Sequence, residues 1–449
     1  MSPLVAFERV GSIAPRRITE LAFQSGGSMS SLARNGCVSA HNFAAMNVVV
    51  TGIGAVTPLG HSFEDISASL LSGKTAIREV TPDRYGRSGR HFMAKIDEIP
   101  CPPETLADEF NQMDRLEQAC LSSAAQSLVN AGLWNNRSNM RIGIVAGIGG
   151  EHLKQWEIDF HDGGTQVFHL TRTGQSVVYR IRDSMQLCGP AVCVAAACAS
   201  SGYAMAIARD WVRMGWVDVC LTGGGDIITP VSLAGFHNLR ALSRRDDDPA
   251  LVSRPFDRDR DGFVIGEGSA FMVLESERSA RQRNATIFGE MAGVGMSSDA
   301  SHMVIPSLEP TYAARAILSA MDDAGVTPAD IDYINAHAAG TLVGDRAEAA
   351  AIRIAMNTEV GRIPVSSTKS MSGHLLSGAA VFEAIACLTA IAHQTVPPTL
   401  NLDHPDPQCD VLHVPHQSRP QRVRAAASNS FGFGGANLCV IFREVAKAA

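Results

Sequence analysis

The chain has 449 residues, of which 45% are hydrophobic, and this is enough to bury a large core in two domains or in one duplicated unit. Its net charge of −7 comes without a cluster of basic residues, which argues against a nucleic-acid surface. The ten cysteines include no Cys-x-x-Cys pair, so zinc sites and a disulfide framework are both disfavoured, and a reducing cytoplasm is the expected location.

Residues 1–45 differ from the rest of the chain. They are rich in Ser, carry four arginines and show no sustained periodicity, so we expect a poorly ordered N-terminal extension. Three origins stay open: a transit peptide, a disordered tail, or a misassigned start with translation beginning at Met29 or Met46. Elsewhere no apolar run approaches the roughly 20 residues that span a bilayer, so no membrane span is expected.

The globular sequence begins at Asn47 with a buried strand and a glycine-rich turn, from Val48 to Gly60. Its Gly-x-Gly pair superficially suggests a dinucleotide fingerprint. However, the third glycine comes only at Gly60, and Pro58 interrupts the helix that should follow, so the pattern excludes nucleotide binding. Helices are predicted over 62–72 and 114–131, a strand over 141–147, and an irregular polar segment over 159–173.

A short buried strand and an apolar helix meet at Cys198, in the run Val194-Ala-Ala-Ala-Cys-Ala-Ser-Ser-Gly-Tyr-Ala-Met-Ala-Ile-Ala208. A thiol at a helix N-terminus lies near the positive end of the helix dipole, which favours the nucleophilic thiolate. The alternative is that Cys198 is a small apolar core residue, which is the usual role of a cysteine in an Ala/Val run.

A strand over 217–225 precedes the run Asp257-Arg-Asp259-Arg-Asp261-Gly262, which resembles a calcium-binding loop. The twelfth position of such a loop needs a bidentate Glu, but here it is Gly268, and the flanking sequence indicates a strand. We therefore expect a solvated turn and no calcium site.

From residue 287 a second series of elements follows. Strands are predicted over 287–295, 332–336, 364–367, 425–428 and 438–442, and helices over 312–324, 345–356 and 378–393. This alternation predicts a parallel-rich sheet with helices on its faces. Ser-Gly follows both Cys198 and His374 at the same spacing, ahead of an Ala-rich helix, which suggests a duplicated unit with a chemical group at the same point of each copy and a closely packed helix seam.

Two histidines strengthen the case for catalysis. His337 follows the strand Tyr333-Ile-Asn-Ala, and His374 follows Ser366-Ser-Thr-Lys369-Ser-Met-Ser-Gly. One such histidine is more often structural. Three reactive side chains at strand or helix junctions, however, lie where the active site of an α/β protein is expected.

Five stretches resemble the successive motifs of the β-ketoacyl-[acyl-carrier-protein] synthases, and are closest to the elongating type I/II condensing enzymes. They are Ala195–Ser201, Arg254–Gly268, Asn335–Glu348, Ser366–Gly378 and Asn429–Asn437, and the similarity runs from about Asn47 to Arg443. The resemblance implies an α/β, thiolase-like fold: two similar halves in a five-layer αβαβα arrangement, in a homodimer. The half with the nucleophilic cysteine would span 46–290, and the half with the two histidines 291–446.

The resemblance also implies roles for single residues. Cys198 would be the nucleophile that accepts the acyl chain. His337 and His374 would bind the malonyl thioester carbonyl and assist decarboxylation. Phe433 would lie near the acyl pocket, and its backbone N–H would form the oxyanion hole with that of Cys198.

Four further residues follow from the same motifs. Lys369 would lie close to the histidine pair, with Asp345 and Glu348 as acidic residues that support it, and Thr341 would bind the phosphopantetheine arm. The family loop His-Gly-Thr-x-Thr is here His-Ala-Ala-Gly-Thr, so Ala339 lacks one of the two hydroxyls that contact this arm. The departure leaves the reaction class intact and makes a specialised pathway a live alternative to housekeeping fatty-acid synthesis.

The implied reaction is a decarboxylative Claisen condensation. An acyl thioester held on Cys198 would join malonyl-[acyl-carrier protein] to give a 3-oxoacyl-[acyl-carrier protein] two carbons longer, in fatty-acid or specialised acyl or polyketide synthesis. Because loss of CO₂ supplies the carbanion, no strong base is required, and neutral histidines suffice as hydrogen-bond donors. No metal or redox cofactor is expected, since the phosphopantetheine arrives on the carrier protein.

Two alternatives remain. A non-catalytic partner subunit, like the chain-length factors of aromatic polyketide systems, would lack the nucleophilic cysteine. A thiolase-type acyltransferase acting on CoA esters would carry a second active-site cysteine. The chain-initiating synthases, in turn, carry Asn where His374 stands.

Overall fold

The computed structural model describes residues 46–80, 91–161, 163–164 and 176–446, so the expectations for residues 1–45 and for 165–173 lie outside the described residues. The described strands are β1 (Val48–Val56), β2 (Arg78–Val80), β3 (His91–Met93), β4 (Ile142–Gly147), β5 (Ala191–Val194), β6 (Val219–Asp226), β7 (Gly268–Ser276), β8 (Gly289–Ser298), β9 (Tyr333–Asn335), β10 (Pro364–Ser366), β11 (Thr395–Val396), β12 (Leu412–His413), β13 (Arg419–Pro420), β14 (Ala425–Gly432) and β15 (Ala436–Arg443).

The described α-helices are α1 (Phe63–Leu71), α2 (Ala107–Gln112), α3 (Arg115–Asn130), α4 (Leu153–His161), α5 (Val177–Ser184), α6 (Ser200–Arg213), α7 (Pro230–Asn238), α8 (Glu277–Gln282), α9 (Thr311–Ala324), α10 (Leu342–Met356), α11 (Lys369–Ser372) and α12 (Ala379–His393). Among the short 3₁₀ helices, η5 (Leu376–Gly378) and η6 (Phe433–Gly435) adjoin the cavity described below.

The main sheet consists of two sets of strands with the same order and the same directions. In the first set, β1-β7-β6-β4-β5, the β1/β7 and β7/β6 pairs are antiparallel and the β6/β4 and β4/β5 pairs are parallel. The second set, β8-β15-β14-β9-β10, repeats this pattern strand for strand. A short antiparallel pairing of β1 with β8 joins the two sets. The chain is thus internally repeated, and the sheet is mixed, not parallel-rich, because β7 and β15 insert antiparallel between the first and third strands of their sets.

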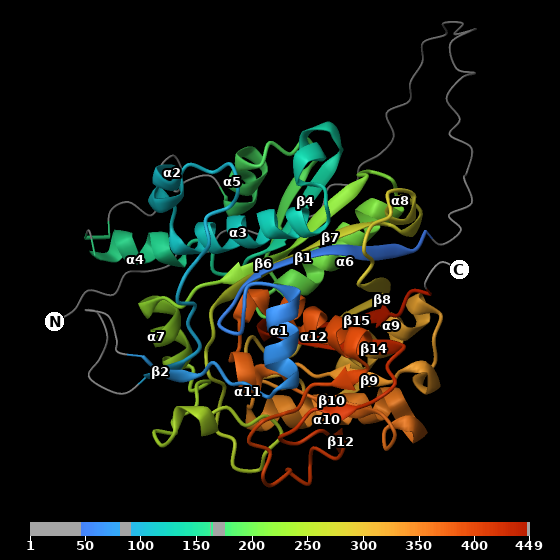
Figure 1. Ribbon diagram of the computed structural model, residues 1–449. Helices are drawn as coiled ribbons and strands as arrows, with labels where there is room; N and C mark the ends of the chain where they lie inside the picture. The colour runs from blue at the N-terminus through green and yellow to red at the C-terminus, as the bar shows by residue number, and fades with distance from the viewer. Residues whose placement is uncertain (1–45, 81–90, 162, 165–175, 447–449) are drawn as a thin grey trace, which may run out of the picture. The chain divides into compact units, whose positions relative to one another are not determined.

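The helices and the two strand sets form five layers (Figure 1). Helix α3 covers β1 and β7 on one outer face, and α9 covers β8 and β15 on the other, with α10 packed beside it. Helices α6 and α12 lie between the two sets of strands and contact each other. This is the predicted αβαβα arrangement.

Paired glycines let the outer helices lie directly on the strands. A Cβ at Gly52 or Gly54 of β1 would stand 2.2 Å from a backbone oxygen of α3. In the second copy, a Cβ at Gly293 or Gly295 of β8 would stand 2.2 Å or 2.0 Å from a backbone oxygen of α9. The Gly-x-Gly pair that superficially suggests nucleotide binding is therefore explained by close helix packing, and both copies use it.

The central seam is closely packed, as predicted. A Cβ at Gly202 of α6 would lie 3.2 Å from the Cβ of Ala380 in α12, and the Ser201 hydroxyl accepts a 3.2 Å hydrogen bond from the N–H of Val381. The segment Leu376–His393 is long and apolar enough to cross a membrane, contrary to the expectation that no such run exists, but 89% of it is buried inside the protein. Its place is the core layer between the strand sets.

Three expectations from local sequence patterns are wrong, the third of them only in part. Part of the predicted irregular polar segment is helical, because α4 extends to His161. Strand β5, predicted to be buried, is a half-exposed edge strand. The turn at Asp257 is solvated only in part: Asp259 and Asp261 are exposed, but the Asp257 carboxylate is fully buried. It accepts hydrogen bonds from the N–H groups of Asp259 and His404 at 2.9 and 2.7 Å and pairs with Arg254.

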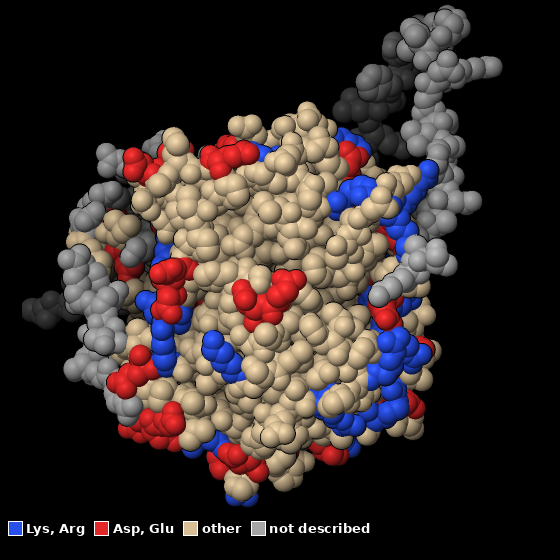
Figure 2. All heavy atoms as spheres, in the orientation of Figure 1, with Lys and Arg blue, Asp and Glu red and all other residues tan. Residues whose placement is uncertain are grey.

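Figure 2 shows small groups of acidic and basic side chains scattered over one face, with broad uncharged areas between them.

Candidate active site

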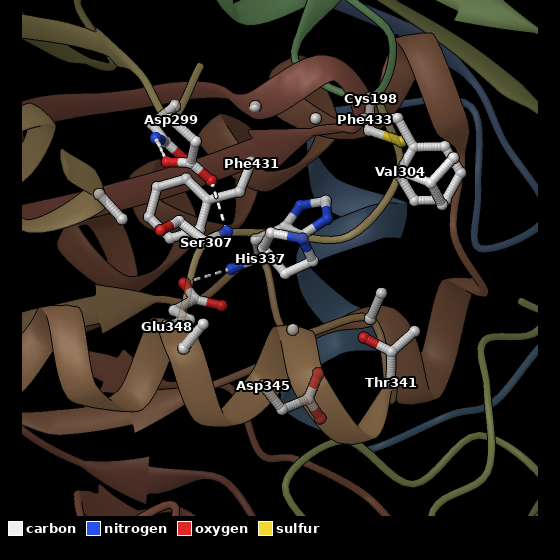
Figure 3. A pocket seen from close by; sticks show the side chains of 18 of the residues that line it. Cys198, Asp299, Val304, Ser307, His337, Thr341, Asp345, Glu348, Phe431 and Phe433 are labelled. Atoms are coloured by element: carbon white, nitrogen blue, oxygen red, sulfur yellow. Dashed lines mark hydrogen bonds between the residues drawn. The ribbon is translucent and has the colours of Figure 1, made fainter. Parts of the chain in front are cut away.

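One cavity brings together side chains from both strand sets. Cys198 comes from the first copy, and His337 and His374 come from the second; all three line the cavity. The predicted residues Thr341, Asp345, Glu348 and Phe433 line it as well, and Figure 3 shows His337 between Phe433 and Glu348. Of the predicted site residues, only Lys369 does not line this cavity; it is 2% exposed.

A sharp turn presents Cys198 to the cavity. The chain leaves β5 at Val194 and passes through Ala197, whose φ of +48° is in the left-handed region that side chains disfavour. The Ser200 hydroxyl stabilises this conformation, because it accepts a hydrogen bond from the N–H of Ala196 at 2.9 Å and donates one to the Ala197 carbonyl at 2.6 Å. Helix α6 then begins at Ser200, so the thiol lies immediately before the helix N-terminus, as predicted.

The expectation that this position favours a thiolate is wrong for the resting protein. Burial raises the pKa of Cys198 to about 11, even though the charge of Lys369 and a hydrogen bond from the N–H of Phe433 lower it. The carboxylates of Asp226 and Glu383 oppose ionisation further. Desolvation raises the pKa by more than the helix N-terminus lowers it, so Cys198 is a thiol at neutral pH.

The loop between β14 and β15 lies directly against the cysteine turn. A Cβ at Gly432 would stand 2.8 Å from the Ala196 carbonyl and 3.4 Å from the backbone nitrogen of Cys198, so only glycine permits this approach. The next residue, Phe433, directs its N–H at the thiol. The loop therefore places one hydrogen-bond donor beside the sulfur, at the predicted position.

The two imidazoles lie edge to face, with ring centroids 5.2 Å apart. The N–H of Leu376 donates to Nδ1 of His374 at 3.3 Å, which leaves Nε2 of His374 to carry the hydrogen. Lys369 Nζ lies 3.4 Å from Nδ1 of His337, and an ammonium donating there selects the same tautomer. Burial and then the charge of Lys369 lower the pKa of both histidines well below the usual value, so both are neutral donors.

Lys369 has a partner that the sequence motifs do not identify. Its ammonium pairs with the carboxylate of Glu383 and donates to the His337 carbonyl. Glu383 is 1% exposed on α12, and burial raises its pKa to about 7 while Lys369 lowers it. The sequence does contain a signal for this pair: Glu383 is the single acidic residue in the apolar run 379–391, and a buried carboxylate needs a partner.

Asp345 and Glu348 act on the backbone of the loop after His337, and Lys369 hydrogen-bonds to neither of them. Glu348 accepts hydrogen bonds from the N–H groups of His337 and Ala338 at 2.9 and 2.6 Å. Asp345 accepts from the N–H of Gly340 at 3.1 Å. Both carboxylates project from the first turns of α10 and fix the conformation of the loop that carries the imidazole.

Glu348→Gln lowers the free energy of unfolding by about 1–3 kcal/mol. The amide NH₂ of glutamine replaces one carboxylate oxygen and cannot accept a hydrogen bond, so one of the two buried N–H groups is left without an acceptor. Burial raises the pKa of Glu348 from 4.5 to about 7. The free energy of unfolding of the wild-type protein therefore falls as the pH rises through that interval, whereas a glutamine at this position adds no such pH dependence. The difference in free energy of unfolding between wild type and Glu348→Gln therefore becomes smaller between about pH 5 and about pH 8.

Urea unfolding at the two pH values measures this difference. Glu444→Gln, which alters a surface pair with Arg422, is the matched control and should leave the midpoint unchanged within error. Equal midpoints for Glu348→Gln and wild type would contradict the structural role of Glu348.

The segment 299–310 forms one wall of the cavity, and the sequence motifs did not identify it. Val304, Pro306 and Ser307 line the cavity, and Asp299 accepts a 2.9 Å hydrogen bond from the N–H of Ser307 (Figure 3). This wall has no regular secondary structure, so no periodicity in the sequence signals its position.

Comparison with known proteins agrees with this geometry. The family models "Beta-ketoacyl synthase, N-terminal domain" and "Beta-ketoacyl synthase, C-terminal domain" match residues 45–280 and 288–403. The chain is 39% identical over 412 residues to the 3-oxoacyl-[acyl-carrier-protein] synthase 2 of Synechocystis sp., which covers 90% of this chain and 99% of the relative.

Solved structures give the same result. A chain from a type II polyketide synthase acyl-carrier protein in complex with its ketosynthase superposes with a TM-score of 0.79 at 28% identity, covering 89% of this chain and 100% of that one. A chain from a ketosynthase in complex with its chain length factor, from Xenorhabdus doucetiae, gives 0.75 at 26% identity, with coverage of 89% and 98%. With matching family models over most of its length, this chain belongs to the β-ketoacyl synthases, an acyltransferase family of the thiolase fold.

Proposed function

We propose that this protein carries out the decarboxylative condensation of an acyl thioester held on Cys198 with malonyl-[acyl-carrier protein]. The product is a 3-oxoacyl-[acyl-carrier protein] two carbons longer. The observation that carries the proposal is the meeting of one thiol and two neutral imidazoles in a single cavity. A chain-length partner does not need this set, and a thiolase needs a second cysteine in it.

In the first step, the Cys198 sulfur attacks the acyl thioester carbonyl. A new C–S bond forms, the bond to the carrier sulfur breaks, and the leaving carrier sulfur takes up the proton that the Cys198 thiol releases. The N–H groups of Phe433 and Cys198 stabilise the tetrahedral oxyanion. Each such donor contributes about 10²–10³ in rate in comparable sites.

In the second step, the malonyl thioester loses CO₂, and the electron pair of the broken bond delocalises onto the thioester oxygen as an enolate. Nε2–H groups of His337 and His374 donate to that oxygen. The enolate carbon then attacks the acyl carbonyl on Cys198, the Cys198 sulfur leaves with the electron pair, and a proton from the solvent restores the thiol. Lys369, held by Glu383, keeps a positive charge beside His337 throughout.

The proposed partner is an acyl carrier protein, and support comes from the similar ketosynthase solved with its carrier protein. The phosphopantetheine arm arrives with that partner, so the proposal assigns no metal or redox cofactor to this chain. The pathway is fatty-acid synthesis or a related specialised acyl or polyketide synthesis, as in its relatives. A cytoplasmic location completes the proposal and fits the nine free cysteines among the described residues.

A homodimer is proposed through the face that carries α4 and β5. Trp156 and Phe160 of α4 are 51% and 77% exposed, β5 is the edge strand of the main sheet among the described residues, and its Val192 is exposed. A second copy would cover these groups. Light scattering on the pure protein tests this: a mass of one chain refutes the homodimer, and assembly only with a different homologue assigns the face to a chain-length partner.

Purified protein, acyl-carrier protein and malonyl-carrier protein together test the proposed function. We expect release of CO₂ and formation of the 3-oxoacyl carrier. An idle partner subunit would give neither unless an active homologue were added. A thiolase-type enzyme would act on CoA esters without releasing CO₂.

Ala339→Thr lowers KM for the acyl-carrier substrate by about 2- to 10-fold, because a hydroxyl facing the phosphopantetheine arm adds one hydrogen bond of about 0.5–1.5 kcal/mol. Ala339 lines the cavity and is 8% exposed, so a side chain added there would border the space that the proposed arm occupies. Steady-state kinetics measures KM, and alkylation of Cys198 serves as the control for an intact site. An unchanged or raised KM would show that the arm does not pass this residue.

A further inference from the structure

A buried carboxylate and a buried hydroxyl connect the two halves close to the cysteine turn. Asp226 ends β6 in the first half, and Ser377 lies in η5 of the second half, three residues after His374. The Ser377 hydroxyl donates to Asp226 Oδ2 at 2.9 Å and accepts from the N–H of Gly149 at 2.8 Å. Asp226 is 5% exposed and Ser377 2%.

This chain of hydrogen bonds ends against the turn that presents the nucleophile. A Cβ at Gly149 would lie 3.6 Å from the Ser200 hydroxyl and 4.0 Å from Cα of Ala197, the two residues that shape that turn. Gly149, whose N–H binds the Ser377 hydroxyl, therefore lies beside the cysteine turn. The hydrogen bonds of Asp226, Ser377 and Gly149 thus connect the turn that holds Cys198 in one half with the segment that carries His374 in the other.

Asp226 also carries an unneutralised charge. Within the described part of the chain no basic side chain pairs with it, and its stabilisation comes from Ser377 and from the N–H of Ile227 at 3.0 Å. Burial raises the pKa of Asp226 to about 6, so the carboxylate is charged at neutral pH.

We propose that Asp226 and Ser377 form a clamp that holds the cysteine turn in register with the His374 segment. Both are positioning residues, because they act on the reaction through Cys198 and His374. The clamp rests on the proposed function.

Ser377→Ala tests the clamp, since it removes the bridge and keeps Asp226. Single-turnover condensation should fall about tenfold, because small displacements of reacting groups are costly, whereas acylation of Cys198 should fall less. Ser377→Thr, which retains the hydroxyl, should restore condensation. Ser67→Ala is the control, because it removes a buried hydroxyl of α1 that is hydrogen-bonded to Thr389 of α12, the helix that follows η5.

Unchanged condensation in Ser377→Ala, or an equal loss in Ser67→Ala, overturns the clamp. A wild-type protein that acylates but never condenses would instead overturn the proposed function.

Discussion

Replacing Cys198 with alanine should abolish the acyl-enzyme and, with it, all condensation. The sulfur is the only group of the cavity that can form the thioester, and the turn that holds it depends on Ser200 and Ala197, which the substitution leaves in place. Fold and thermal stability should therefore stay close to those of wild type. Intact-mass spectrometry after incubation with an acyl-carrier thioester shows a mass increase in wild type and none in the variant.

Cys220→Ala is the matched control, because Cys220 is fully buried in β6 and does not line the cavity. Its acyl-enzyme should form at the wild-type rate. Persistent acylation of the Cys198→Ala protein would remove the mechanism altogether, whereas loss of acylation in both variants would indicate a general effect of altering the core.

Replacing His374 with alanine should leave acylation intact and reduce condensation by about 10²–10³, the usual cost of losing one donor to a developing oxyanion. His374 presents its Nε2–H to the cavity because the N–H of Leu376 occupies Nδ1. That donor acts on the enolate, not on the acyl transfer, so the two steps should separate.

Rapid quench followed by mass spectrometry resolves the two steps: the acyl-enzyme should accumulate and CO₂ release should slow. His393→Ala, at the exposed end of α12, should behave as wild type in both steps. Equal losses of acylation and condensation in His374→Ala would show that this histidine serves the first step, and would reverse the division of roles.

The repeat and the site could be predicted from local patterns. Ser-Gly at the same spacing after Cys198 and His374 indicated two equivalent junctions, and the structure places them before α6 and α12. The strand-end positions of the reactive residues predicted a common site, because such ends meet at one edge of a sheet. Each of these features depends on residues that are close together in the chain, and for this reason each can be recognised in the sequence.

What escaped prediction depends on burial. The ionisation of Cys198 follows from desolvation, which outweighs the helix terminus, and desolvation is a property of the assembled core. Glu383 finds Lys369 only after α12 packs beside the site. Similarly, the turn at Asp257 is polar in sequence and appears solvated, but donors from residues distant in the chain surround its carboxylate.

The strand-for-strand repeat has a further consequence. One copy contributes the sulfur and the other contributes both imidazoles, so each copy by itself is chemically incomplete, although its fold is equivalent to that of its counterpart. The apolar helices α6 and α12 each need the other copy as a cover. Because the reactive groups are divided between the two copies, loss or displacement of either copy would abolish the activity of the whole site.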